Sequence, residues 1–295
     1  MIRPCQSPEN VRSGLRHMLS ALGLSRLETP PPGSAVAPPN ALMLAIDIEG
    51  GSTFEQLIRN PNARMGVAIF DPARGSRAGA SRLKTYQFIS GDDEFLRTAT
   101  DKFLFGKTTH CKTRDFPTHI LSLLPPSRPI VLIAHSMNSD LATLKLMGFD
   151  ARQDSRMYLV DTHPMSGDVL RTHRGFGSLS RVMSELRLEF EPGDLHYAGN
   201  DAHFTMRVAL SLARRGYLQQ CPNPGAKDMA ILRALDKETM APIVRRPRII
   251  IVRKISQQGR GEVSRARALL REETEMLREV DNSDFTVEGL CWLFV

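Results

Sequence analysis

Apolar runs separated by turn-forming residues divide the first part of the chain into strand-like segments. Three such runs follow one another at residues 42–48, 65–70 and 83–89. Each run is short, rich in apolar side chains and bounded by Gly, Pro, Asn or Asp, which is typical of a β-strand. Because no strong helical pattern separates them, the three runs predict an antiparallel meander.

From residue 118 onward, apolar segments of helical and strand type alternate. The wholly apolar run Ile130–Ala134 predicts a buried parallel strand, and residues 157–160 predict another. Helices are expected at 118–124, 140–147, 179–188 and 200–215. This order predicts an α/β fold with a mixed sheet, in which an antiparallel meander is followed by parallel strands and flanked by helices.

Proline-rich and basic segments set the expected domain limits. The stretch 30–40 contains five prolines and cannot hold a helix or a central strand. The expected divisions are a flexible leader and linker at 1–40, a compact domain at 41–217 and a basic C-terminal extension at 218–295. Within the extension, a strand with basic flanks is expected at 245–254 and a helix at 263–280. The basic run is a candidate nucleic-acid contact, or else a strand with a solvated flank.

Composition narrows the class of protein only modestly. The chain of 295 residues has 39 Lys and Arg against 32 Asp and Glu, a formal net charge of +7 that mildly favours a polyanionic partner. Its four cysteines lie far apart and form no Cys-x-x-Cys pair. This spacing argues against a structural zinc site and a disulfide scaffold, and it suits a reducing compartment.

The sequence predicts an intracellular protein, cytoplasmic or nuclear, with no membrane partner. No run approaches the ~18 consecutive apolar residues of a membrane span, and the N-terminus lacks a secretory apolar core. Arginines around a short amphipathic segment at 11–22 make a mitochondrial presequence the alternative interpretation, which Glu9 and Glu28 disfavour.

Acidic residues follow the predicted strands and begin the predicted helices. Asp47 and Glu49 are two apart at the end of the first strand, so their side chains share one face. Asp140 and Asp201 each begin a helix, where a carboxylate is favoured. Carboxylates that converge in this way are suited to hold hard divalent ions such as Mg²⁺, because those ions take oxygen ligands.

Three short motifs carry a family resemblance. They are Asp-Ile-Glu at 47–49, His-Ser-Met-Asn-Ser-Asp at 135–140 and His-Tyr-Ala-Gly-Asn-Asp at 196–201. In order and spacing they resemble the Asp-x-Glu, His-Asn-x-x-x-Asp and His-x-x-x-x-Asp motifs of the DEDDh 3′→5′ exonucleases, in the ribonuclease H-like superfamily. Ser136 stands where the family has Asn, at a position that binds no metal. The resemblance covers about residues 41–216.

The resemblance implies a role for each motif residue. Asp47 would bridge two Mg²⁺ or Mn²⁺ ions, Glu49 and Asp201 would complete the first metal site, and Asp140 would act at the second. His196 would be the general base that takes a proton from the attacking water, a role that suits an imidazole near pH 7. Two ions would then activate the water and relieve charge on the leaving oxygen.

The same resemblance suggests the substrate and partners. It implies hydrolysis of single-stranded nucleic acid to nucleoside 5′-monophosphates, with RNA favoured over DNA. Gly50 and Gly51 could let the terminal nucleotide approach the backbone. Residues 195–202 look most like a fungal branch of the family that includes an exonuclease partnering Argonaute in RNA silencing. A protein partner in RNA processing or silencing is therefore an expectation.

Two other functions use the same residues. A nucleic-acid- or protein-binding scaffold would keep the fold and lack turnover. A serine esterase would use Ser136 as nucleophile, with Asp161 and His196 downstream. The tight turn of such an esterase wants Gly where Ala134 and Asn138 stand, so the residues favour the nuclease over the esterase.

Overall fold

The structure is a computed structural model that describes residues 8–24, 35–50, 62–74, 81–171 and 177–245. The chain forms two compact units, Met1–Arg245 and Arg246–Val295, and all of the described residues belong to the first. Of the expected basic strand, only Arg245 lies within the described residues, and the expected helix at 263–280 lies outside them.

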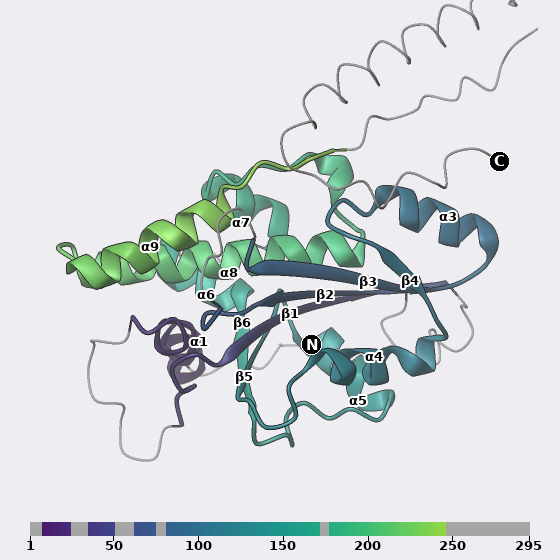
Figure 1. Ribbon diagram of the computed structural model, residues 1–295, viewed down its shortest axis with the longest axis horizontal. Coiled ribbons are helices and arrows are strands. Elements are labelled where there is room, and N and C mark those ends of the chain that lie inside the picture. Colours follow the sequence, from purple (N-terminus) through teal and green to yellow (C-terminus); the bar gives the residue numbers. More distant parts are fainter. Residues whose placement is uncertain (1–7, 25–34, 51–61, 75–80, 172–176, 246–295) are drawn as a thin grey trace, which may run out of the picture. The chain divides into compact units, whose positions relative to one another are not determined.

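A six-stranded mixed sheet forms the centre of the unit, with strand order β4-β3-β2-β1-β5-β6 (Figure 1). The strands are β1 Leu42–Glu49, β2 Ala63–Phe70, β3 Leu83–Ser90, β4 Thr108–His110, β5 Ile130–Ala134 and β6 Met157–Asp161. Strands β1, β2 and β3 pair antiparallel, whereas β5 is parallel to β1 and β6 is parallel to β5. The expected meander followed by parallel strands is confirmed.

Helices cover both faces of this sheet (Figure 1). They are α1 Pro8–Ala21, α3 Asp93–Lys102, α4 Phe116–Leu123, α5 Asn138–Leu146, α6 Thr162–Leu170, α7 Leu179–Glu185, α8 Ala198–Gln220 and α9 Ala226–Thr239. One core cluster joins the sheet to α1, α6, α7, α8 and α9, and the other joins it to α4 and α5. The sheet is therefore a middle layer between two helical layers, consistent with a ribonuclease H-like fold.

The alternation of side chains along β1 decides which layer each residue meets. Met43 and Ala45 belong to the cluster on the α8 side, and Leu44 and Ile46 belong to the opposite cluster. Because successive strand residues point to opposite faces, Asp47 extends the α8-facing row. The long helix α8 therefore lies over the face on which Asp47 emerges.

Some elements carry too weak a pattern to be expected from sequence. Strand β4 is only Thr-Thr-His, half-buried or exposed, and it pairs with the end of β3. Helices α3 and α6 begin at aspartates that cap backbone N–H groups, Asp92 to Phe95 and Asp161 to His163. Their apolar stripes are short, so packing against the sheet adds to what local sequence provides.

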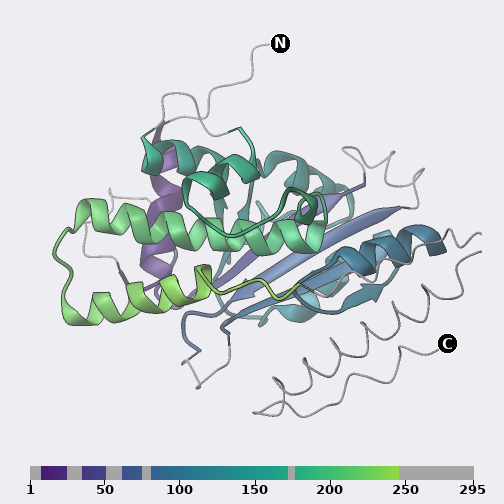
Figure 2. The same cartoon turned by 90° about the horizontal axis from the view of Figure 1, so that it is seen from above.

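Two helices outside residues 41–217 share the core of the sheet. Met18 of α1 and Leu24, which follows that helix, are fully buried, and Leu235 of α9 is 1% exposed. Figure 2 shows α8 and α9 running side by side. The buried Arg207 of α8 donates to the carbonyls of Thr239 and Ala241, at 2.6 and 2.7 Å. The segment after α9 is thus attached to the central helix through a buried cation.

Candidate metal centre

Strand β1 presents two carboxylates on the face covered by α8. Asp47 and Glu49 lie opposite Gly66 and Arg64 of the antiparallel neighbour β2. Both acidic side chains are half-buried, where the strand passes from the core to the edge of the sheet. Ile48 points to the other face and packs against the second core cluster.

Helix α8 reaches these carboxylates because β2 and the helix contain glycine at their contact. A Cβ built on Gly66 would lie 1.7 Å from the Ala198 carbonyl oxygen, and one on Gly199 would lie 2.6 Å from the Phe103 ring. Glycine at position 66 lets the first turn of α8 rest on β2, and glycine at position 199 leaves room for Phe103 and for Gln87 of β3. Asp201 lies in that first turn.

The buried Asn200 fixes the direction of this turn. Its amide donates to the carbonyls of Lys102 and Asp194, at 3.0 and 2.8 Å, and its oxygen accepts from the Leu104 N–H at 3.0 Å. Asn200 therefore ties the start of α8 to the distant segment 102–104 and to the loop just before the helix, which holds the neighbouring Asp201 in place.

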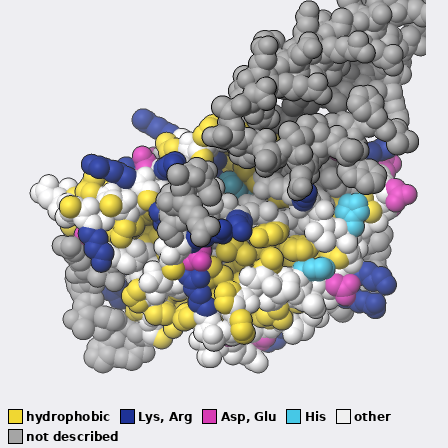
Figure 3. Space-filling model, in the orientation of Figure 1, with side chains coloured by type: hydrophobic (Ala, Val, Ile, Leu, Met, Phe, Trp, Pro, Cys, Tyr) yellow, Lys and Arg dark blue, Asp and Glu magenta, His cyan; other side chains and the backbone are white. Residues whose placement is uncertain are grey.

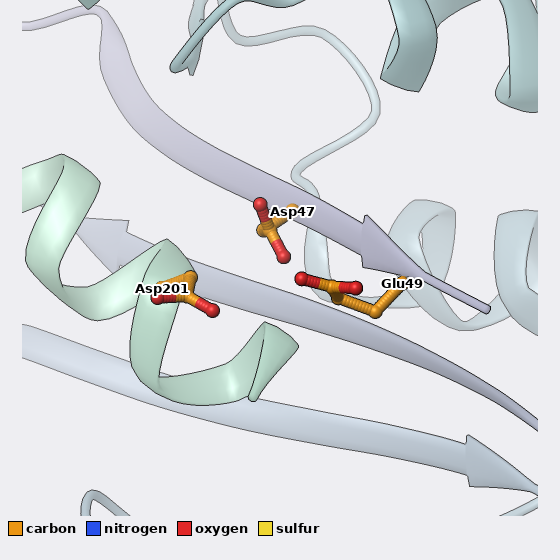
Figure 4. Close-up of side chains that lie close together, drawn as sticks. All are labelled: Asp47, Glu49 and Asp201. Atoms are coloured by element: carbon orange, nitrogen blue, oxygen red, sulfur yellow. The ribbon is translucent and has the colours of Figure 1, made fainter. Parts of the chain in front are cut away.

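The three carboxylates Asp47, Glu49 and Asp201 meet in one small volume. Each offers an oxygen, and these oxygens all lie within 4.8 Å of one another. Figure 4 shows the carboxylates of Asp47 and Glu49 on β1 and that of Asp201 on α8 pointing toward one another. Hard divalent cations take oxygen ligands in such a cluster.

Asp140 joins the same neighbourhood from α5. It is 6% exposed, and its carboxylate accepts a hydrogen bond from the Ile48 N–H at 2.9 Å. It lies outside the set of three that share the 4.8 Å limit. Its charge nevertheless raises the pKa of Asp47. The structure thus brings all four expected carboxylates into one electrostatic group, with three of them in closest contact.

Burial and repulsion from nearby carboxylates raise the pKa values of the three aspartates. Burial is the largest cause for Asp47, whose pKa lies well above its usual value, and repulsion from Asp201, Asp140 and Glu49 follows. Burial likewise raises the pKa of Asp140 and of Asp201 to about 7. Like charges at short range oppose ionisation, so a bound cation would favour the charged forms of these carboxylates.

One oxygen of the group has no hydrogen-bond partner. The Oδ2 atom of Asp47 is buried and unpartnered among the described residues. A buried carboxylate oxygen in that state costs free energy unless a cation or donor satisfies it. The donor set is all oxygen, and it fits a hard divalent cation bound by Asp47, Glu49 and Asp201.

His196 stands on the loop that leads into α8. It is exposed and adopts φ of 64°, in a bend between the 3-10 turn Pro192–Asp194 and the helix. The carboxylate of Asp201 accepts from the backbone at His196 and Tyr197, and these bonds act to lower its pKa. The backbone of the expected base is therefore hydrogen-bonded to one expected metal ligand, and the residue itself is exposed.

Comparison with known proteins identifies the family. A family model described as "DNA polymerase III subunit epsilon-like, C-terminal domain", DEDDh_C, matches residues 64–212. The chain belongs to the DEDDh exonuclease family. The match spans the second and third motifs and begins after the first, so Asp47 and Glu49 lie outside it and are placed at the site by the first motif and by their geometry. No curated protein matches the chain significantly.

Membership of the DEDDh family supports a nuclease of the ribonuclease H-like superfamily, and divalent metals belong to that family's chemistry. The match does not assign the chain to the fungal branch with the Argonaute partner. Among the described residues, no helix is both long and apolar enough to cross a membrane.

The second motif of this DEDDh domain builds a turn rather than a hydrolase triad. Asp161 accepts from the backbone N–H groups of Ser136, Met137 and His163, at 2.9 to 3.0 Å. Its carboxylate therefore stabilises the β5–α5 turn, in which Ser136 adopts φ of 62°. An esterase would need that carboxylate to orient a histidine side chain, so the structure favours the nuclease interpretation.

One of the two expected glycines is required by the backbone itself. Gly50 adopts φ of 116°, and a Cβ there would lie 2.5 Å from the Asn62 carbonyl oxygen. Its lack of a side chain is thus required by the β1–β2 connection, whatever it does for substrate. Gly51 lies outside the described residues.

The sequence did not single out Arg64, whose charge acts on the carboxylates, or the two aromatic rings that pack against it. Arg64 on β2 has its guanidinium carbon 5.1 Å from the Phe95 ring centroid and 5.0 Å from that of Tyr197. Its charge lowers the pKa of Asp47 and of Asp201. The signal available in sequence was the third motif itself, since Tyr197 follows His196, but no pattern pointed to Arg64 or Phe95.

Proposed function

We propose that the protein is a divalent-metal-dependent 3′→5′ exonuclease that degrades single-stranded nucleic acid to nucleoside 5′-monophosphates. The observation that carries the proposal is the convergence of Asp47, Glu49 and Asp201 around the unpartnered Oδ2 of Asp47. Family membership supports the nuclease class, whereas the polarity and the product follow from the motif resemblance.

The residues present suit two Mg²⁺ or Mn²⁺ ions. Asp47, Glu49 and Asp201 would hold one, and Asp47 with Asp140 would hold the other. When bound, such ions lower the pKa of a coordinated water and stabilise charge on the leaving oxygen. The ligands stand on strand β1 and at the starts of helices α5 and α8 rather than on loops, which favours carboxylates held in place before substrate arrives.

His196 would take the proton from the attacking water. Its exposure gives a water molecule access to the imidazole, and its backbone N–H donates to the carboxylate of Asp201. A neutral imidazole near pH 7 can accept a proton and release it to solvent. Its left-handed backbone conformation is set by the turn before α8.

The nature of the polymer rests on the resemblance. RNA is proposed over DNA, and a protein partner in RNA processing or silencing is proposed from residues 195–202 alone. On the face shown in Figure 3, the described Lys and Arg side chains are dispersed rather than gathered in one continuous patch.

The test is degradation of single-stranded RNA and DNA labelled at either the 3′ or the 5′ end. Purified wild type and the Asp47→Asn variant are compared with Mn²⁺ and with EDTA. Mn²⁺-dependent release of mononucleotides from the 3′ end, absent in the variant, is the expected result. A folded, metal-binding wild type that degrades neither polymer would instead favour a scaffold.

A further inference from the structure

The positive charge of Arg64 is not required to neutralise the four carboxylates once two divalent ions are bound. The side chain emerges from β2 on the α8-facing side, since Arg64 pairs with Glu49 and Gly66 pairs with Asp47 in the antiparallel register. Four carboxylates and two divalent ions have balanced charges. The positive charge of Arg64 is then left over beside the reacting centre.

The guanidinium is held in a defined position. It lies between the rings of Phe95 on α3 and Tyr197 at the start of α8, about equally distant from both centroids, at 5.1 and 5.0 Å. Stacking on aromatic faces orients the planar group and uses none of its N–H donors. Its Nε is buried without a hydrogen-bond partner among the described residues. The two rings therefore orient the cation without engaging its N–H donors.

Tyr197 also links Arg64 to the reacting groups. Its carbonyl accepts the Asp201 N–H at 2.9 Å, and it follows His196 directly in the chain. An anion bound by Arg64 would therefore lie next to both the expected base and a metal ligand.

We infer that Arg64 binds a phosphate of the nucleic-acid substrate, held in place by Phe95 and Tyr197. This inference rests on the proposed function, because it assumes that the polyanion enters the site of Asp47. The guanidinium offers a planar fork of donors that matches two phosphate oxygens. The alternative is that Arg64 only offsets the repulsion among the carboxylates.

The two roles differ in what the loss of Arg64 does. A phosphate contact predicts that Arg64→Gln weakens nucleic-acid binding by about tenfold and lowers the slope of log Kd against log salt concentration by about 0.7. Arg64→Lys keeps the charge but loses the planar fork, so it should restore the salt slope and only part of the affinity. A neutralising role predicts instead tighter Mn²⁺ binding and unchanged nucleic-acid binding.

The experiment measures the anisotropy of a short 5′-fluorescein single-stranded RNA over a range of salt, with Mn²⁺, in a His196→Ala background that slows turnover. Arg156→Gln is the matched control. It removes one positive charge just before β6, at the opposite end of the parallel strands from Asp140, where Arg156 pairs with Asp154. Thermal unfolding with adenosine 5′-monophosphate and with adenosine separates a phosphate contact from a base contact.

The inference is upheld if Arg64→Gln, and not Arg156→Gln, binds RNA more weakly and with a smaller slope of log Kd against log salt concentration. Adenosine 5′-monophosphate should also raise the Tm only of proteins that retain Arg64. It is overturned if Arg64→Gln binds RNA like its background and only its Mn²⁺ affinity changes. Binding that depends on Arg64 in a wild type without exonuclease activity would uphold this contact and refute the proposed catalysis, so the two failures are distinguishable.

Discussion

Replacing Asp47 by Asn should stabilise the metal-free protein, although Asp47 is the central residue of the site. Asn has the shape of Asp, and the Oδ2 atom that it replaces has no hydrogen bond to lose. What disappears is one charge from a group whose oxygens lie within 4.8 Å of one another. A substitution at a site residue that increases stability is a specific signature of a site built for a cation.

The magnitude follows from Coulomb's law. Two unit charges 4.8 Å apart repel by about 3.5 kcal/mol at an effective dielectric constant of about 20. Glu49 is half-buried and partly screened by water, so about 2 kcal/mol is a reasonable net gain at pH 8. For a unit of this size, that gain corresponds to an increase in Tm of about 4–8 °C.

The assay is thermal unfolding of wild type and Asp47→Asn at pH 8, with EDTA and with Mn²⁺. Asp71→Asn is a control of opposite sign, because Asp71 forms a two-pronged ion pair with Arg128, at 2.9 and 2.5 Å. The ion pair lowers the pKa of Asp71, so neutralising this carboxylate should lower the Tm. In wild type, Mn²⁺ should raise the Tm through preferential binding to the folded state.

Two results would refute the reasoning. If Asp47→Asn melts below wild type in EDTA, the carboxylate contributes to the fold rather than opposing it. If the variant keeps the full Mn²⁺ shift of wild type, the ion binds elsewhere. Either result would remove the main physical support for a metal centre at Asp47.

Three further outcomes are expected. Gly66→Ala should displace the first turn of α8, destabilise the protein by about 3 kcal/mol or more and abolish the rise in Tm that Mn²⁺ causes. Gly177 has open space around it, so the control variant Gly177→Ala should melt like wild type. Arg245 pairs with Glu189 and Asp194, at 2.8 and 2.9 Å, on the loop before His196. Arg245→Gln should therefore lower kcat by about fivefold without changing the Mn²⁺ affinity, and Arg245→Lys should restore part of the activity. A rise in KM together with an equal weakening of Mn²⁺ binding would count against a positioning role. Burial lowers the pKa of His135 to about 4, below that of the unfolded chain, so the neutral form is favoured in the fold. The contribution of His135 to stability should therefore fall by about 2 kcal/mol as the pH drops from 6.5 to 4. In urea titrations the difference in stability between wild type and His135→Asn should shrink by that amount over this range, and parallel curves for the two proteins would contradict it.

The fold was largely predictable because the central strands carry their own signals. The apolar runs of β1 and β5 are bounded by turn residues, and the two-residue alternation along β1 is enough to place Asp47 and Glu49 on one face. The meander order and the long helix α8 followed from the same patterns. Local sequence was sufficient here because burial, period and turn chemistry agree.

The parts that escaped prediction depend on contacts between distant segments. Strand β4 is polar and exists by pairing with β3, and the approach of α8 depends on Gly66 far from it in sequence. Arg64 acquires its place only when β2, α3 and the start of α8 come together around it. No period or motif in one segment encodes such a meeting, so the cation next to the carboxylates could not be foreseen.

The attachment of Arg207 to the carbonyls of Thr239 and Ala241 bears on how the chain is made. While the ribosome has delivered only residues up to the end of α8, this guanidinium has no carbonyls to bind, and the surface of α8 that later receives Leu232 and Leu235 is open to water or to chaperones. An unpaired cation in a forming core is costly, so the nascent domain should stay incomplete until residue 243 has left the exit tunnel. Stalling translation shortly before that point should leave a protease-sensitive chain, even though every residue of the three motifs has already been synthesised.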